Sequence, residues 1–254
     1  MPIDVNGNSI NSLGTKIFNS TQIVTNNLVW YYDAGVADSY SGSGTSVVDL
    51  VGTSANNATL SDFSYVTTYG GSFQNTSTAN GAYGISVPLT NFSKLVGTCE
   101  FWMRPTSWSN SNGMFVNNND GTANSANWWW FGVWDTGGPI YFRLGRNDGN
   151  CCINDNSISG WSSVHALNTW GHYAVTWNSG VESKIYFNGA LRQTVSIGTL
   201  TNSNDSSNGR WGLGHATANN RWLGQMGTFK HYNTVLTNAQ ILQNYQADRP
   251  RFGR

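Results

Sequence analysis

The stretch KIYFNGALRQTV, from Lys184 to Val195, places two strand-forming runs on either side of Asn188-Gly189. An Asn-Gly pair in this setting predicts a two-residue β-hairpin, because both turn positions require a positive φ angle. The two runs correspond to expected strands over 183–188 and 191–197. This hairpin is the sharpest local structural signal in the chain.

The same alternation of strand-forming runs and turn residues continues through most of the sequence on both sides of the hairpin. From Asn27 onward, short apolar or aromatic runs alternate with clusters of Gly, Asn, Ser and Asp, which is the pattern of many strands joined by turns. Besides the hairpin pair, the expected strands span 28–34, 72–75, 83–87, 97–104, 113–117, 127–134, 139–145, 171–178, 210–215 and 222–232.

A single helix is expected near the end, in TNAQILQNY. Thr237 is its N-cap and Gln240, three residues later, completes a capping box. Ile241, Leu242 and Tyr245 then share one face. A dozen short strands and one terminal helix predict an all-β, two-sheet antiparallel sandwich. We expect a polar N-terminal arm over 1–26, the sandwich over 27–236, and the helix with a basic tail packed on it over 237–254.

Composition excludes several classes of protein. Charged residues make up only 10% of the chain, against about 25% in an average globular protein, and the net charge is zero. The only basic cluster, Arg249, Arg251 and Arg254, is interpreted as a solvated terminus, so we expect no nucleic-acid partner. No apolar run approaches 18 residues, which argues against membrane insertion. The polar start MPIDVNGNSINSLG does not resemble a signal peptide.

Cysteine usage fits a chain made in a reducing compartment. Three cysteines do not form a disulfide framework, and Cys99 lies in an apolar run that predicts a buried thiol. We therefore expect synthesis in a cytoplasm.

Several segments resemble laminin-G-like, concanavalin A-like jelly-roll domains. The resemblance covers roughly residues 27–248 and rests on the order and spacing of the segments, since each one alone is loose. It implies that the sandwich is a jelly roll. The segments are NLVWYYDAG, GGSFQNTSTANGAYGISV, TCEFWMRP, TWGHYAVTW followed by KIYFNGAL, and GQMGTFKHYNTVLTNAQILQNYQA.

The ending QNYQADRPRFGR, together with a polar N-terminal arm that does not resemble a signal peptide, resembles laminin-G-like proteins of tailed bacteriophages. This resemblance implies a virion protein made in the host cytoplasm, most simply a capsid-surface decoration protein whose domain projects outward. Its implied partners are other virion proteins, further copies of itself and host-surface glycans. The alternative is a tail fibre or another lectin-like carbohydrate-binding module.

The segment NWWWFGVWD, residues 127–135, holds four tryptophans within seven residues. Successive side chains of a strand point to opposite faces. Trp129, Phe131 and Val133 then form an unbroken apolar face, which we assign to the core. The other face carries an aromatic row interrupted by Gly132, consisting of Trp128, Trp130 and Trp134.

Three explanations of the outer aromatic row remain open. Loop residues 146–163 can fold over it, with Trp161 packing down. The row can be a subunit interface, where tryptophan is enriched at hot spots. It can also be a platform on which sugar rings stack. An exposed row of this size exceeds the apolar patch that a monomer normally tolerates, so it needs either a cover or a partner. Trp128, Trp130, Trp134 and Trp161 are therefore the candidate glycan-binding or interface residues.

The acidic residues argue against an enzyme. Glycoside hydrolysis needs two carboxylates flanking the bond, and the glucanases of this fold carry a Glu-x-Asp-x-Glu triplet. The chain has only two glutamates, Glu100 and Glu182, and no such triplet. We expect Glu100 to be a structural hydrogen-bonding group, with Arg104 as a partner on the same strand face.

No cofactor is required by any motif, but a Ca²⁺ ion is possible. Laminin-G-like domains often bind calcium at the rim of the sandwich through Asp, Asn and main-chain oxygens. The candidate ligands are Asn119, Asp120, Asp148 and Asp155. Such Asx-Gly clusters are first of all turn formers.

Overall fold

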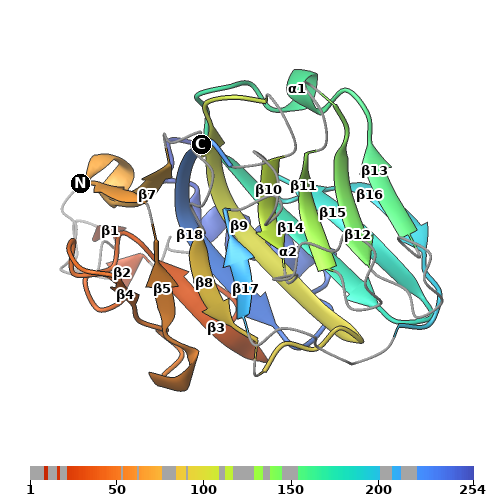
Figure 1. Cartoon of the computed structure of the whole chain (residues 1–254), viewed down its shortest axis with the longest axis horizontal. Helices are drawn as coiled ribbons and strands as arrows, with labels where there is room; N and C mark the ends of the chain where they lie inside the picture. Colours follow the sequence, from red (N-terminus) through yellow and green to blue (C-terminus); the bar gives the residue numbers. More distant parts are fainter. Residues whose placement is uncertain are drawn as a thin grey trace.

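The computed structural model describes residues 9–10, 16–17, 22–52, 54–61, 63–75, 84–89, 91–108, 112–116, 129–133, 138–144, 154–200, 208–212 and 222–254. Two antiparallel sheets lie face to face and enclose the core between them (Figure 1). The architecture is an all-β, jelly-roll-like sandwich with a short C-terminal helix, as the sequence predicts.

Sheet I has eight strands in the described residues and contains the tryptophan-rich strand β11. All its ladders are antiparallel. From one edge to the other, the strands are β13 (Asn154–Ile158), β12 (Ile140–Leu144), β11 (Trp129–Val133), β10 (Asn112–Val116), β17 (Asn208–Trp211), β8 (Ile85–Pro88), β5 (Ala58–Leu60) and β4 (Ser46–Val47).

Sheet II is built on its two longest strands, β9 (Val96–Pro105) and β18 (Gly224–Tyr232), which pair with each other. A separate two-stranded ladder joins β1 (Ser9–Ile10) to β2 (Lys16–Ile17). The remaining strands of sheet II are β16 (Ala190–Ser196), β15 (Glu182–Phe187), β14 (Gly171–Asn178), β7 (Ser72–Asn75), β6 (Ser64–Val66) and β3 (Leu28–Asp33), the last beside β18.

The expected Asn-Gly hairpin is confirmed. Asn188 and Gly189 have φ angles of 52° and 76°, and they join β15 to β16 with Phe187 paired to Ala190. Every strand expected from the sequence is present, within a few residues at its ends. The sequence pattern missed β4, β5, β6 and β13, and also the two-residue strands β1 and β2 in the expected arm. All of these except β13 have only two or three residues, and β13 reads Asn-Asp-Asn-Ser-Ile, which is poor in strand formers.

The core between the sheets is predominantly aromatic. Trp129, Phe131 and Val133 all belong to it, which confirms the assignment of that face of β11. Phe115 from β10 packs edge-on against Trp129, with ring centroids 5.0 Å apart. Cys99 is a buried free thiol, also as predicted. No helix in the described part of the chain is long and apolar enough to cross a membrane.

Helix α2 (Asn238–Asp248) covers the outer face of sheet II, and a second short helix, α1 (Trp161–Val164), closes one end of the sandwich. Two single 3₁₀ turns, η1 (Ser54–Asn56) and η2 (Thr68–Gly70), lie in loops. The capping box of α2 is confirmed, because Thr237 and Gln240 bond reciprocally.

The buried face of α2 differs from the expected one. Ile241 packs on the sheet beneath it, but Leu242 is 41% exposed. Asn244 is fully buried instead, because its amide is saturated by hydrogen bonds. Part of the expected arm also belongs to this layer. The Val24 main-chain N–H donates to Asn244 Oδ1 at 2.7 Å, and the Val24 carbonyl accepts from the Tyr232 hydroxyl at 2.9 Å.

The Asn-Gly turn is also a packing contact for α2. A Cβ atom on Gly189 would lie 2.9 Å from Tyr245 Cδ1 and 3.0 Å from Leu242 Cδ1, whereas one on Gly44, with a φ of 84°, would meet nothing within 4 Å. Gly44→Ala should therefore cost only the left-handed backbone penalty of about 1 kcal/mol. Gly189→Ala should cost at least ~1 kcal/mol more, since it also crowds α2.

Urea unfolding of the two variants beside the unmodified chain measures this difference. Equal losses of stability in the two variants would show that the turn does not contact α2.

Candidate functional site

Trp130 lies on the face of β11 away from the core, yet its exposed fraction is only 1%. Arg143 occupies the facing position on β12, and its guanidinium carbon lies 5.9 Å from the Trp130 ring centroid. This burial corrects the expectation that Trp130 offers a surface to a sugar or a subunit. Of the three explanations, a cover formed within the chain fits Trp130. Trp128 and Trp134 lie outside the described residues.

Trp161 begins α1 and is fully buried in the main core. Its ring contacts Phe187 at a centroid distance of 5.1 Å, and its indole Nε1–H donates to the Tyr173 hydroxyl at 3.3 Å. The expectation that Trp161 packs down on the outer aromatic row is wrong, because its contacts are with Tyr173 and Phe187 in the core between the sheets. Its candidacy as a binding residue is corrected, because the ring closes the end of the sandwich and presents no surface.

The calcium candidates receive little structural information. Asn119, Asp120 and Asp148 lie outside the described residues, and Asp155 occupies a position in β13 paired with Arg143 in β12. Within the described ranges, no cluster of three or more His, Cys, Asp or Glu side chains could hold a metal. The Ca²⁺ ion stays a prediction.

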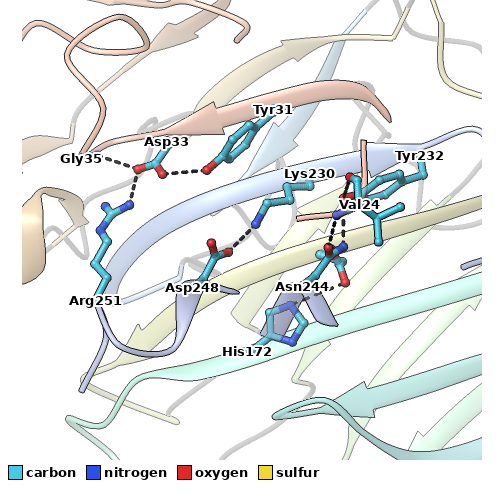
Figure 2. A network of polar contacts seen from close by, with 11 residues as sticks. Val24, Tyr31, Asp33, Gly35, His172, Lys230, Tyr232, Asn244, Asp248 and Arg251 are labelled. Atoms are coloured by element: carbon cyan, nitrogen blue, oxygen red, sulfur yellow. Dashed lines mark hydrogen bonds and ion pairs between the residues drawn. The ribbon is translucent and has the colours of Figure 1, made fainter. Parts of the chain in front are cut away.

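A buried polar network joins α2 to the outer face of sheet II (Figure 2). Lys230 of β18, almost fully buried, forms an ion pair with Asp248 at the end of α2. One turn earlier, Asn244 Nδ2 donates to Glu100 Oε2 of β9 at 2.6 Å and to the Tyr232 hydroxyl at 2.9 Å.

The expected pairing of Glu100 with Arg104 is wrong. Arg104 lies near the end of β9, where its Nε donates to the Asn168 carbonyl at 3.0 Å. Glu100 faces α2 instead, four residues earlier in the same strand. Its role as a structural hydrogen-bonding group is nevertheless what the contacts show.

Glu100 and His172 lie side by side without forming an ion pair. His172 Nε2 is 3.7 Å from Glu100 Oε1, and both side chains are buried. Burial raises the pKa of Glu100 to about 8, although Lys230 and the Asn244 hydrogen bond partly oppose the shift. Burial, with the charge of Lys230, holds the pKa of His172 well below its usual range. At neutral pH this contact therefore joins two largely uncharged groups.

The residues after α2 dock on the sandwich, as expected for a tail packed on it, and this corrects the interpretation of Arg251 as part of a solvated terminus. Arg251 pairs with Asp33, and its guanidinium donates to the carbonyls of Tyr69 at 2.9 Å and Gly71 at 2.6 Å. The Phe252 ring stacks on Trp102, with centroids 4.4 Å apart.

The docked tail forms one side of a cavity of about 210 Å³, here named the tail cavity. The loop before β14 and the η2 turn supply the other sides. Its aromatic walls are Tyr69, Trp170 and Phe252, and its polar lining consists of Asn168, Thr169, Gly253 and Arg254.

Tyr69 is the exposed aromatic wall of the tail cavity, with an exposed fraction of 43%. Its backbone is left-handed, with a φ of 57°, and the Arg251 hydrogen bond to its carbonyl holds this conformation. The ring meets Trp170 edge-on at a centroid distance of 5.6 Å. Tyr69 is therefore fixed in place while its ring stays accessible.

Two polar side chains of the tail cavity have donors to spare. The main chain of Asn168 is anchored by a bond from its N–H to the Pro105 carbonyl at 2.7 Å, and its side-chain amide has no partner among the described residues. Arg254 donates through Nε to the Trp170 carbonyl. Its terminal guanidinium nitrogens likewise have no partner in the described ranges.

No sequence pattern predicted the tail cavity. Its walls come from three segments that are far apart in the sequence, namely Tyr69, residues 168–170 and residues 252–254. The one available signal was Phe252, an apolar residue inside a basic tail.

A family model described as the concanavalin A-like lectin/glucanases superfamily matches residues 79–242, well over half of the chain. The chain belongs to this superfamily. Its sandwich is thus a lectin-type fold, in agreement with the resemblance seen in the sequence. A search of curated proteins finds no match.

Solved structures of the binding domains of clostridial toxins share the fold. The binding domain of botulinum neurotoxin DC in complex with rat synaptotagmin II has a TM-score of 0.63 and 16% identity, covering 88% of this chain and 52% of that chain. A botulinum neurotoxin type C structure, described as depending on two ganglioside molecules for cell entry, has a TM-score of 0.64 and 17% identity, covering 88% and 51%.

The binding domain of Paraclostridial Mosquitocidal Protein 1 has a TM-score of 0.63 and 17% identity, covering 87% of this chain and 52% of that chain. The chain thus spans about half the length of these structures. At such identities the likeness shows the fold alone.

The raised pKa of Glu100 predicts that this residue makes stability fall as pH rises. The folded-state pKa of about 8 lies above the ordinary value of 4.5, so the contribution is full below pH 4.5 and is lost as pH rises through 8. Glu100→Gln keeps an acceptor for Asn244 but cannot ionise. Its stability relative to the unmodified chain should therefore increase between pH 4.5 and 8.

Thermal unfolding across this pH range, with Glu182→Gln as the partly exposed control, measures the effect. A difference between Glu100→Gln and the unmodified chain that does not change with pH would contradict the shift.

Proposed function

We propose that the chain is a non-enzymatic carbohydrate-binding module and that the tail cavity receives the sugar. The observation that carries the proposal is a fixed, accessible Tyr69 ring beside the uncommitted amide of Asn168 and the free guanidinium nitrogens of Arg254. A pyranose has an apolar face of C–H groups that can stack on an aromatic ring. Its hydroxyls need donors and acceptors at the edge of that ring, which amides and guanidinium groups supply.

The size of the tail cavity limits its ligand. Sites for drug-sized molecules usually measure about 300–1,000 Å³. A cavity of about 210 Å³ suits a single ring, such as a terminal or branching residue of a glycan. Its mixed lining of aromatic walls and a few polar groups is typical of specific small-molecule sites.

The positions of the two glutamates support binding without cleavage. Glu182 of β15 lies opposite Asn178 of β14, and Asn178 in turn lies opposite Val96 of β9. Val96 is four residues before Glu100 in the same strand. At about 3.3 Å per residue, this offset is ~13 Å along the strand. Glycosidase carboxylates lie about 5–10 Å apart. Glu100 is also buried under α2, whereas Glu182 is partly exposed and forms an ion pair with Lys184.

The comparisons support the class of function rather than a ligand. The superfamily is named for lectins and glucanases, and one toxin structure is described by its dependence on gangliosides. A ligand of that toxin cannot be transferred to this chain, which spans about half of the toxin domain at 17% identity. The site itself therefore has to supply the argument for a sugar.

As the setting for this module, we propose a bacteriophage particle, with the domain on the capsid surface and a tail fibre as the alternative. The support is the resemblance of QNYQADRPRFGR to endings of phage laminin-G-like proteins. In this chain the same ending holds α2 on the sandwich through Asp248 and docks the tail through Arg251 and Phe252, which forms one side of the tail cavity. Other virion proteins and copies of the chain itself would be its partners, and the glycan would lie on the host surface.

Replacing Tyr69 by Ala should abolish or strongly weaken sugar binding, by tenfold or more, because the stacking surface is lost. The fold should be preserved, since the tail bonds the Tyr69 carbonyl rather than its side chain. Binding of the full chain to a glycan array, followed by titration of the best glycan, measures the loss.

Leu191→Ala is the matched control, because Leu191 is 42% exposed but lies on β16, outside the tail cavity. An unchanged affinity in Tyr69→Ala would place the sugar elsewhere. No bound glycan for the unmodified chain would overturn the proposed function.

The phage setting predicts that the N-terminal arm drives self-association. A chain that begins at Gln22 keeps the Val24 contacts with Asn244 and Tyr232 and should remain folded. The full chain should be an oligomer and the shortened chain a monomer. Light scattering on both chains measures the number of subunits, and the same number for both would remove assembly from the roles of the arm.

A further inference from the structure

We infer that the tail cavity selects a sugar that carries a carboxylate group, with Arg254 as the residue that makes the selection. This inference rests on the proposed function and goes further by naming the ligand class. It depends on the charge balance around the cavity, on the way the chain holds Arg254, and on the donors that Arg254 leaves unused.

The tail cavity has one charged side chain in its lining, that of Arg254, and no acidic side chain. The acids of neighbouring elements are already engaged. Asp33 pairs with Arg251, and Asp248 pairs with Lys230. The described surroundings therefore offer no acidic side chain to pair with the Arg254 guanidinium, which favours an anionic ligand.

The buried histidine near the tail cavity does not alter this balance. Burial lowers the pKa of His165 to about 4, so its imidazole is uncharged at neutral pH. The charge of Arg254 contributes a smaller part of the same lowering of the His165 pKa. No second cation in the lining competes with Arg254 for an anion.

The chain holds Arg254 in a defined position by a hydrogen-bonded coil. The N–H groups of Phe252 and Arg254 both donate to the Arg249 carbonyl at 3.1 Å, and Gly253 between them is left-handed with a φ of 68°. The Nε atom of Arg254 then donates to the Trp170 carbonyl. One edge of the guanidinium is thereby fixed before any ligand arrives.

The unused donors of Arg254 match a carboxylate. Arginine binds carboxylates through two parallel N–H···O bonds, and charge-assisted bonds of this kind are about twice as strong as neutral ones. The terminal nitrogens of Arg254 have no partner in the described ranges. A uronic acid ring stacked on Tyr69 would offer its carboxylate at the ring edge, where these donors can meet it.

Three probes that share one ring separate charge from shape. Glucuronate carries the carboxylate, glucuronamide replaces it by a neutral amide of the same size, and glucose lacks the group. Calorimetric titration of the full chain should show glucuronate binding at least tenfold more tightly than the other two. Arg254→Gln should reduce glucuronate to the affinity of glucuronamide, and Tyr69→Ala should weaken all three.

The possible outcomes distinguish the two levels of the proposal. Equal affinity for the three probes overturns the acidic-sugar inference and leaves carbohydrate binding intact. Binding of none of them, with no glycan bound on the array, overturns the proposed function itself. Acetate competing as well as glucuronate does would identify a general anion site and overturn the sugar selectivity.

A second measurement keeps the inference testable if Arg254→Gln does not fold. In the unmodified chain, molar sodium chloride should weaken glucuronate binding and leave glucose binding nearly unchanged, because salt screens charge pairs. An equal response of both ligands to salt would contradict a role for the Arg254 charge.

Discussion

The buried ion pair between Lys230 and Asp248 fixes the arrangement on which the outer layer of this molecule depends. Lys230 lies opposite Glu100 in the ladder between β18 and β9, and its buried charge would be very unfavourable there without a partner. Asp248 supplies that partner only when α2 lies in one orientation across the sheet. Buried pairs of this kind add little net stability, but losing one partner typically costs about 3–5 kcal/mol. The pair therefore specifies where the helix ends.

The end of α2 in turn determines where the tail goes. Arg251 follows three residues after Asp248, and its N–H donates to the Asp248 carbonyl at 3.1 Å. From that point the Arg251 guanidinium reaches Asp33, and Phe252 enters the aromatic cluster around Trp102. A Cβ atom on Gly227 would lie 2.5 Å from the Phe252 ring, so the sheet itself leaves space for this docking. The tail cavity follows from these contacts.

Local patterns in the sequence predicted most of the fold. The Asn188-Gly189 turn and the Thr237 capping box depend only on neighbouring residues, and both were found. The error on α2 had a physical cause. Asn244 and Asp248 resemble the solvent-facing side of a helix. Asn244 is buried because it bonds Glu100 of β9, which lies 144 residues away, and Asp248 is partly buried because it pairs with Lys230 of β18. Hydropathy cannot reveal a polar group whose partner is remote in sequence.

The candidate site was harder to predict, for a related reason. The tryptophans of β11 invite a functional interpretation, but Trp129 fills the core and Trp130 is covered beside Arg143. In a sandwich closed by aromatic contacts, a dense run of tryptophans says more about packing than about ligands. A binding ring has to be held still and yet remain uncovered. Tyr69 meets both conditions through its carbonyl bond to Arg251 and its edge contact with Trp170, and neither contact is visible in its neighbouring residues.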